Sequence, residues 1–404
     1  MAEQVIKPDL DFVKGVIAAG GDSLKKCYQC ATCSVVCNVT PDQNPFPRKE
    51  MVWAQWGLKE KFKGNPDVWL CHQCNDCTAY CPRDAKPGEV LGAIRKQTIA
   101  QYSSPSALVD FVNNKSSMIL LILIPAVIVG LVISMFGSWS PEGEVIFSNF
   151  MPILAIQFLF TPALLFGVGV GIMGMRKFWA DMKEANGVTT GDLKGSVTAM
   201  FKELMSHEKF KECDESKDRA TSHLLVFYSF IALGIATALG VLYIDILHLE
   251  SPFRFGYGTP IKIFGTVGAI AILAGSYLMM SNRFKHADRV GLGSYFDWLL
   301  IGLIGTIGVS GTLAWLTRVA GIGGLAYPLY FIHLVVVLSL FVYLPFSKLA
   351  HMFYRGAALS FNKYSGREAL AEAQPAVEAA AAPVKSPSES EQTGTETKQE
   401  SGQE

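Results

Sequence analysis

The chain has 404 residues, with 35 basic and 35 acidic side chains, nine cysteines and a mean hydropathy of +0.29. Half of the residues are hydrophobic and only 17% are charged, against about a quarter in soluble domains. This composition excludes a disordered chain and a basic nucleic-acid-binding protein, and it favours a protein partly immersed in a membrane. No apolar signal-peptide core follows Met1, so we expect the cysteines to stay reduced and to bind metal.

Eight of the nine cysteines lie in two short runs near the amino terminus. Both runs have the spacing C-x2-C-x2-C-x3-C, and Pro82 follows the second run. In this spacing three thiolates of a run bind one cubane cluster, and the fourth reaches the neighbouring cluster. The spacing therefore predicts two [4Fe-4S] clusters. One would be held by Cys27, Cys30, Cys33 and Cys81, and the other by Cys71, Cys74, Cys77 and Cys37.

Zinc is the alternative metal for these cysteines. Structural zinc sites usually take two ligands from each of two separated pairs, whereas each run here holds four cysteines in eleven residues. The spacing therefore favours clusters. His72 is expected beside the site or in solvent, because its run already supplies four thiolates. Cys213 lies among charged residues and is expected to be an ordinary exposed thiol.

Six apolar runs follow, each long enough to cross a hydrocarbon core of about 30 Å, which takes about 20 helical residues. They lie at residues 118–136, 150–175, 222–247, 262–280, 297–317 and 326–349. Connections 176–221 and 281–296 hold most of the Lys and Arg residues between these runs, and such connections stay in the cytoplasm. We therefore predict a mainly α protein of the cytoplasmic (inner) membrane, with six spans and both termini in the cytoplasm.

These features divide the chain into three predicted parts. Residues 1–112 form a cytoplasmic, α-helical ferredoxin-type domain with two clusters. Residues 113–360 form a six-helix domain surrounded by membrane lipid. From Ala369 onward Ala, Pro, Glu, Ser and Thr dominate without an apolar period, and such a segment cannot offset its ordering entropy. Residues 361–404 are therefore predicted to be a disordered cytoplasmic tail.

Four histidines at the ends of the third and sixth runs are candidate haem ligands, because ionisable residues at membrane helices are rare and usually functional. At about 100° per residue, the 18 residues from His333 to His351 make five turns, and the 25 from His223 to His248 fall about 20° short of seven. Each pair then shares one helix face. Because the two spans run in opposite directions, His223 would meet His351 near the cytoplasm and His248 would meet His333 near the outer side.

An interfacial or hydrogen-bonding role is the alternative for each of these histidines, and it stays open above all for His248. The separation places His248 near or beyond the end of its helix. Two further histidines, His207 and His286, lie in the cytoplasmic connections and are expected to be solvated.

The cysteine region, including residues 44–48 and 69–83, resembles the iron-sulfur C subunit of heterodisulfide reductases. The membrane part resembles their cytochrome b subunit and the gamma subunit of respiratory nitrate reductases, most clearly around His333 and in the segment from Leu344 to His351. Their fusion in one chain is similar to the C subunit of the quinone-interacting membrane-bound oxidoreductases of sulfate reducers. The nitrate reductase pattern places a second haem histidine where this chain has Leu233, so an outer haem would require His248.

The resemblance implies an electron-transfer subunit of a quinone-dependent oxidoreductase rather than a stand-alone catalyst. It implies haem b, with two haems favoured over one, in a cytochrome b domain, and electron exchange with menaquinone or menaquinol. The implied partner is a cytoplasmic flavin and iron-sulfur subunit pair of the same complex, leading toward adenylylsulfate reductase in sulfate respiration. Two alternatives stay open: a subunit of a heterodisulfide, sulfite or nitrate reductase complex, and a zinc-containing membrane scaffold.

Overall fold

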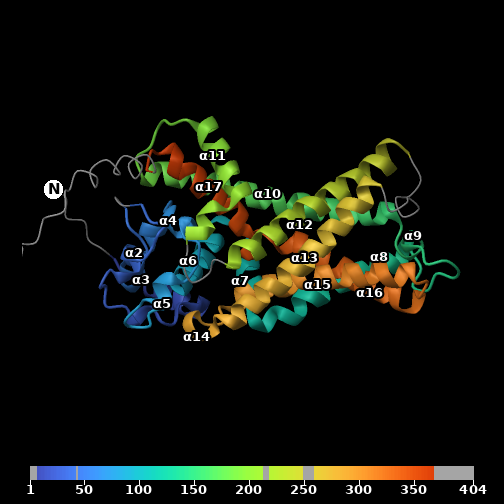
Figure 1. Ribbon diagram of the computed structural model, residues 1–404, viewed down its shortest axis with the longest axis horizontal. Helices are drawn as coiled ribbons and strands as arrows, with labels where there is room; N and C mark the ends of the chain where they lie inside the picture. The colour runs from blue at the N-terminus through green and yellow to red at the C-terminus, as the bar shows by residue number, and fades with distance from the viewer. Residues whose placement is uncertain (1–6, 42–43, 213–217, 249–258, 368–404) are drawn as a thin grey trace, which may run out of the picture.

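The computed structural model describes residues 7–41, 44–212, 218–248 and 259–367. All regular elements in these residues are helices, which confirms the mainly α fold. Short helices from the amino-terminal part gather at one end of an elongated molecule, and long helices run away from them (Figure 1). Cys213 and residues 368–404 lie outside the described residues, so the predictions for this thiol and for most of the tail concern parts that the structure does not describe.

The amino-terminal part consists of short helices joined by turns. In chain order they are α1 (Leu10–Val16), η1 (Ile17–Gly21), η2 (Leu24–Lys26), α2 (Thr32–Val35), α3 (Arg48–Gln55), η3 (Lys59–Phe62), α4 (Asp67–Leu70), α5 (Asp76–Ala79), α6 (Pro87–Tyr102), α7 (Ala107–Asn113) and η4 (Lys115–Ser117). Helix α6 begins with Pro87, whose fixed φ suits the first turn of a helix. It buries Val90, Leu91 and Ile94 against its neighbours, so the short helices surround it.

Six helices of the described chain are long and apolar enough to cross a membrane, one for each predicted run. They are α8 (Met118–Phe136), α10 (Ile153–Ala185), α12 (Asp218–Val241) with η6 (Leu242–Ile246), α13 (Pro260–Lys285), α15 (Tyr295–Val319), and α16 (Gly323–Tyr343) with η8 (Leu344–Phe346). Large apolar side chains such as Ile119, Phe158 and Ile270 are exposed on their outer faces. Extensive exposed apolar surface of this kind fits contact with lipid.

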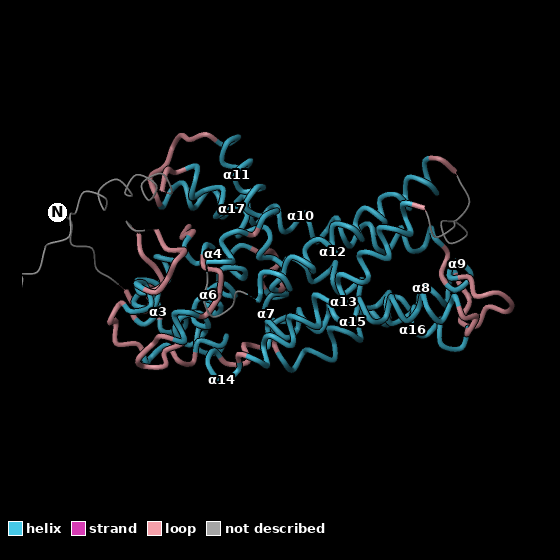
Figure 2. The backbone as a smooth tube through the Cα atoms, viewed as in Figure 1, coloured by secondary structure: helices cyan, strands magenta, loops and turns pink. Residues whose placement is uncertain are grey.

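Shorter elements cap the two ends of this bundle. They are α9 (Phe147–Phe150), α11 (Leu193–Ser206), η5 (Glu208–Glu212), α14 (Ala287–Val290), η9 (Lys348–Ala350) and α17 (His351–Tyr364). Loops lie mostly at the two ends of the molecule, while helices fill the middle (Figure 2).

The sixth span does not continue as one helix to His351. Helix α16 ends at Tyr343, two 3-10 turns follow, and His351 begins a new helix, α17. Pro345 cannot donate a backbone hydrogen bond, and extended Ser347 starts the next turn by accepting from the Leu349 N–H at 3.2 Å. The five-turn relation predicted between His333 and His351 is therefore wrong. Helix α17 also continues past residue 360, so residues 361–364 are helical rather than tail.

One hydrophobic core joins the amino-terminal helices to the near ends of α10, α16 and α17. Trp69 of α4 stacks on Tyr354 of α17 with ring centroids 5.1 Å apart. Ser103 Oγ donates to the Pro345 carbonyl at 3.1 Å, and Asn113 Nδ2 donates to the Phe346 carbonyl at 3.1 Å. These contacts fix the cysteine loops against the membrane helices.

Candidate functional site

The two cysteine runs adopt the same loop conformation twice. We call residues 27–33 the first loop and residues 71–77 the second loop. The third and fifth residues of each loop lie in the left-handed region, with φ of 60° and 70° at Gln29 and Ala31, and of 54° and 72° at Gln73 and Asn75. A short helix then begins in each, α2 or α5, and the two helices contact one another.

These turns aim backbone N–H groups at the first sulfur of each loop. The Gln29 N–H donates to Cys27 Sγ at 3.4 Å, and the Gln73 N–H donates to Cys71 Sγ at 3.3 Å. Hydrogen bonds to sulfur stabilise thiolates and influence the reduction potential of a cluster. Both loops are therefore preorganised for thiolate ligands.

The first group of thiols combines the first loop with a cysteine from the second run. Cys27, Cys30, Cys33 and Cys81 line one pocket, together with exposed Arg48 and Arg83. Cys81 Sγ accepts from the Ala85 N–H at 3.3 Å. Burial raises the pKa of the Cys33 thiol to about 12, and repulsion from the neighbouring thiols adds to this. The group is open to the surface at Cys30, which is exposed.

The second group combines the second loop with Cys37 from the first run. Burial raises the pKa of the Cys37 thiol to about 12, and repulsion from nearby Cys71 and Cys74 contributes. Cys77 lies near the same thiols, and burial raises its pKa as well. Cys71 and Cys77 are only 7% and 8% exposed, so this group lies deeper than the first.

Each group supplies four thiols, which fits a [4Fe-4S] cluster held by four thiolates. Cluster binding removes the thiol protons, so the raised pKa values of these thiols oppose it, and the positive charge of the iron must offset that cost. No three His, Cys, Asp or Glu side chains among the described residues are close enough to hold a single metal ion. The thiolates of a cubane stand farther apart, because each binds a different iron.

Two of the four candidate haem ligands lie together at this end of the bundle. The rings of His223 and His351 have centroids 6.3 Å apart and planes at 76°. His223 Nδ1 lies 2.9 Å from His207 Nε2, and His351 Nδ1 donates to the Lys348 carbonyl at 2.7 Å. Within the described part of the chain both rings thus use Nδ1 in their hydrogen bonds, and Nε2 is available to a metal.

This arrangement fits an iron between the two rings. A metal about 2.0 Å from a nitrogen on each side separates the two ring centroids by roughly 6 Å, close to the observed 6.3 Å. Burial lowers the pKa of His351 to about 4. The imidazole is therefore neutral at physiological pH, the form that ligates metals.

The other two candidate ligands, His333 and His248, lie in different surroundings. His333 lies against α15, with Nδ1 3.2 Å from Ser310 Oγ. His248 is exposed, beyond the end of η6, with a φ of 50°. The structure therefore places His248 outside its helix, as its sequence position suggests, and the outer pairing stays a prediction.

Sequence reasoning missed His207, which we expected to be solvated. It is only 4% exposed, ends α11 in the left-handed conformation, and turns its ring toward His223. His72 is also buried, and its Nε2 lies 2.9 Å from Arg355 Nη2. No local pattern identifies His207, because the packing of η5 against α12 brings it to His223. His72 was expected beside the site or in solvent, and its burial fits the first of these.

Phe210 connects the second loop to the histidines. Its ring lies 4.7 Å from the His72 ring, centroid to centroid, and 5.3 Å from both His207 and His223. A continuous series of side chains therefore runs from Cys71, through its neighbour His72 and Phe210, to His223.

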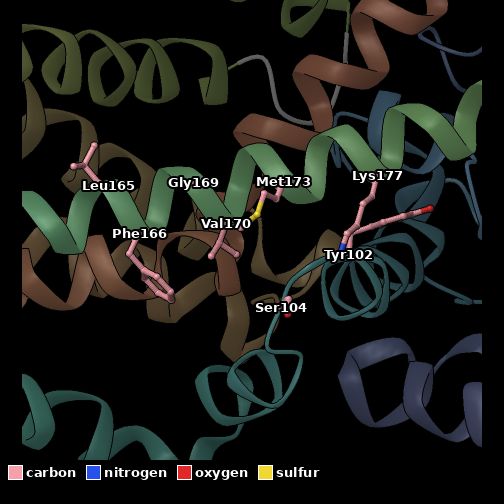
Figure 3. A pocket seen from close by; sticks show the side chains of 8 residues that line it. All are labelled: Tyr102, Ser104, Leu165, Phe166, Gly169, Val170, Met173 and Lys177. Carbon is pink, nitrogen blue, oxygen red and sulfur yellow. The ribbon is translucent and has the colours of Figure 1, made fainter.

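A pocket of about 400 Å³ opens on α10 where the two parts of the molecule meet. Its wall is mostly apolar, while Tyr102, Ser104 and Lys177 lie toward one end (Figure 3). Tyr102 OH donates to Asp181 Oδ2 at 2.9 Å, and burial raises the pKa of this phenol. The pocket thus joins an apolar surface to a polar rim.

Comparison with known proteins agrees with the cysteine geometry. Residues 23–85 match the family model of the 4Fe-4S dicluster domain. The chain therefore binds [4Fe-4S] clusters. It is 34% identical over 100 residues to the C subunit of the H(2):CoB-CoM heterodisulfide,ferredoxin reductase of Methanothermobacter marburgensis, covering 24% of this chain and 54% of that one. A protein of Archaeoglobus profundus, described as similar to the heterodisulfide reductase C subunit, is 30% identical over 92 residues, or 22% and 49% of the two chains.

A longer match covers both parts of the chain. Citrate utilization protein B of Escherichia coli is 25% identical over 329 residues, covering 74% of this chain and 83% of that protein. The chain spans only about half the length of the heterodisulfide reductase subunits that it matches. No solved structure matches the chain. These relatives support an iron-sulfur protein with an electron-transfer role, working as a subunit among partners.

Proposed function

We propose that this chain carries electrons between menaquinone in the membrane and a cytoplasmic flavin and iron-sulfur partner. The supporting observation is the unbroken series of side chains from Cys71 through His72 and Phe210 to the facing pair His223 and His351. When bound, two [4Fe-4S] clusters and haem b accept and release single electrons. The residues of the chain would position these cofactors, shield the buried one from solvent, and leave the exposed one accessible to a partner.

The eight cysteines would hold the two clusters in the exchanged arrangement. Cys27, Cys30, Cys33 and Cys81 would hold the first cluster, and Cys71, Cys74, Cys77 and Cys37 the second. The first loop leaves Cys30 exposed and Tyr28 69% exposed. This is the surface at which a soluble partner would exchange electrons, while the second group stays insulated beside the membrane helices.

His223 and His351 would hold a haem b on the side of the second cluster. Their Nδ1 atoms are held by His207 and by the Lys348 carbonyl, so Nε2 of each ring is the nitrogen that would bind the iron. His333 and His248 would serve a second haem toward the other side of the membrane. His333 keeps its Nδ1 beside Ser310 in a comparable arrangement.

The pocket on α10 is our candidate for the quinone ring. Leu165, Phe166 and Val170 supply an apolar wall, and Lys177 and Tyr102 lie at its polar end. Ligand pockets are mostly apolar with a few polar groups. A quinone also needs such polar groups because its oxidised and reduced forms differ by two protons as well as two electrons. The pocket lies on α10 beside Tyr102 and Ser104, which follow the cysteine region in the chain.

The wider assignment follows from these parts. The Lys- and Arg-rich connections and the cysteine region lie at one end of the helices, which we assign to the cytoplasm together with both termini. Adenylylsulfate reductase would be the final partner in a sulfate-respiring complex. A second candidate is a subunit of another quinone-linked complex, which is favoured by the match of both parts to citrate utilization protein B.

The first test is the cofactor content of the purified full chain. We expect about eight iron atoms in clusters, equal sulfide, and haem b with a low-spin optical spectrum. Zinc in place of iron and sulfide would support the membrane scaffold instead. Proteins that copurify with the chain distinguish the two candidate complexes.

The second test is reduction by a menaquinol analogue in detergent. We expect haem reduction followed by cluster reduction, or the reverse order when the partner supplies electrons. Met173→Trp should fill the pocket and slow the quinol reaction, whereas Met135→Trp, at an exposed position on α8, should not. A haem that the quinol reduces equally fast in both variants would remove the pocket from the proposal.

A further inference from the structure

The carbonyl groups around the two cysteine loops are capped at matching places by different side chains. In the first loop, Gln55 Nε2 donates to the carbonyls of Leu24 and Cys27, at 2.9 Å each. These are the first cysteine and the residue three positions before it.

The second loop has an arginine in this place. Arg95 Nε donates to the Val68 carbonyl at 2.7 Å, and Arg95 Nη2 donates to the Cys71 carbonyl. Val68 and Cys71 stand to the second loop as Leu24 and Cys27 stand to the first. Gln55 and Arg95 are thus structural counterparts, although they come from α3 and α6, and they differ by one full charge.

A second matching place carries arginine in both loops. Arg48 Nε donates to the Gln29 carbonyl at 3.0 Å, and Arg219 Nη1 donates to the Gln73 carbonyl. Arg48 is exposed, however, while Arg219 is partly buried. Water and salt screen an exposed charge more strongly than a buried one.

Two more cations face the second loop. Arg355 Nη1 donates to the Cys71 carbonyl at 3.0 Å, and Lys348 Nζ donates to Gln73 Oε1 at 3.1 Å. The acids that face this region are Asp297, which pairs with Lys348, and Asp76, which lies near Cys37. The further cations at the first loop are Arg83 and Lys26, and both are exposed. Arg83 lies over the Tyr28 ring, and Lys26 pairs with Asp84.

We infer that Arg95, in the place that Gln55 takes at the first loop, raises the reduction potential of the second cluster. This inference rests on the proposed binding of one cluster by each group of cysteines. Each cluster gains one electron on reduction, from the 2+ to the 1+ state, and no bond is made or broken.

The sign follows from electrostatics. A reduced cluster with four thiolates is more negative than the oxidised one, so a nearby fixed cation stabilises the reduced form. Burial of the second cluster acts in the opposite direction, because low polarity disfavours added charge. The same low polarity strengthens the attraction of Arg95, whose guanidinium stays charged.

A charge swap tests this inference in the full chain, purified with its cofactors. Redox titrations followed by EPR spectroscopy give the midpoint potential of each cluster, and Cys81→Ser and Cys37→Ser assign the signals. Arg95→Gln should lower the potential of the second cluster only. Gln55→Arg should raise the potential of the first cluster only. Arg95→Lys, which keeps the charge, should restore most of the wild-type potential.

Other outcomes would overturn the inference in distinguishable ways. Wild-type protein without clusters would reject the proposed function itself. If both clusters are present and their potentials do not change in Arg95→Gln or in Gln55→Arg, the proposed function stands. The role of the charge at position 95 is then rejected. If Arg95→Gln fails to fold, the Gln55→Arg variant decides alone, and an unshifted first cluster contradicts the inference.

Discussion

Nε2 of His207 lies 2.9 Å from Nδ1 of His223, and the two residues come from different helices, α11 and α12. The contact engages Nδ1 of His223 and leaves Nε2 as the nitrogen that would bind the proposed iron. Partners of this kind fix the tautomer and orientation of a ligating imidazole.

Replacing His207 should therefore disturb the haem without removing it. We expect His207→Ala to weaken haem retention by about 10- to 100-fold and to shift the low-spin EPR signal, because His223 loses the group that orients it. His207→Asn, whose side-chain amide can replace the hydrogen bond, should restore part of the signal. His286→Ala, in another connection, is the matched control. A spectrum identical to wild type in His207→Ala would contradict this role.

The two proposed haem sites can be separated by single substitutions. His223→Ala and His351→Ala should each remove the same haem signal, because their rings face one another at 6.3 Å. His333→Ala and His248→Ala should remove a second signal. Optical and EPR redox titration of the four variants measures this. A His248→Ala spectrum that matches wild type would remove His248 from the outer site.

The exchange of the fourth cysteine between the runs predicts which cluster each variant loses. Cys81→Ser should eliminate the cluster of the first loop and leave the second, although Cys81 belongs to the second run. Cys37→Ser should do the converse. Iron content should fall by about half in each variant, as each cubane holds four irons. Cys213→Ser should change neither signal, and loss of the second cluster alone in Cys81→Ser would disprove the exchange.

Glu50 predicts a pH-dependent stability. The pKa of this carboxyl group is raised from 4.5 to about 7, mainly by burial, which outweighs attraction to Lys49, with a smaller contribution from repulsion by Asp67. Between pH 4.5 and about 7 the folded chain binds more protons than the unfolded chain, so the free energy of unfolding falls as the pH rises. Below pH 4.5 this penalty is absent, and above pH 7 it is complete.

Glu50→Gln should remove the penalty. We expect a gain of up to about 3 kcal/mol at pH 8 and little gain at pH 4.5, since each pKa unit corresponds to about 1.4 kcal/mol. Thermal unfolding in detergent at the two pH values measures the difference. Glu60→Gln, at an exposed position, should have no such effect. Equal gains at both pH values would show that the charge of Glu50 is not the cause.

Lys348 and Asp297 form an ion pair where the bundle meets the second loop. Burial lowers the pKa of Lys348 to about 8, while attraction to Asp297 opposes this. Lys348→Met should destabilise the chain by about 3 kcal/mol, because it removes the direct partner of buried Asp297 and leaves Arg283, 3.6 Å away, as its nearest ion-pair partner.

A second substitution separates the lost pair from lost packing. Lys348→Met combined with Asp297→Asn should recover most of the lost melting temperature, because no unpaired charge then remains. Lys285→Met, at an exposed site, serves as the control. A double variant as unstable as Lys348→Met alone would attribute the loss to packing.

Local sequence signals identified the fold class and the cysteines. Six apolar runs can be read without tertiary information, because crossing a membrane requires a length and composition that each segment must satisfy alone. The repeated C-x2-C-x2-C-x3-C spacing likewise acts within a few residues. In the structure Cys81 lines the same pocket as Cys27, Cys30 and Cys33, and the assignment of these four to one cluster stays a prediction.

The angular relation between residues far apart on one predicted helix was a weaker guide than these local signals. The relation between His333 and His351 assumed an unbroken helix, whereas Pro345 and Ser347 interrupt it. His351 still lies opposite His223, because α17 restarts in a direction set by its packing against α4, α10 and α11. A turn of this kind depends on contacts far away in the sequence.

The sequence by itself determined that this is a mainly α chain with six apolar spans and two cysteine runs suited to iron-sulfur clusters. These properties depend on hydropathy and short spacing, which each segment carries within itself. Only the tertiary structure decided that His207 supports His223, that Phe210 bridges His72 to it, and that Arg95 stands where Gln55 does. Such relations arise when distant segments pack together, and no local pattern encodes which side chains will then meet.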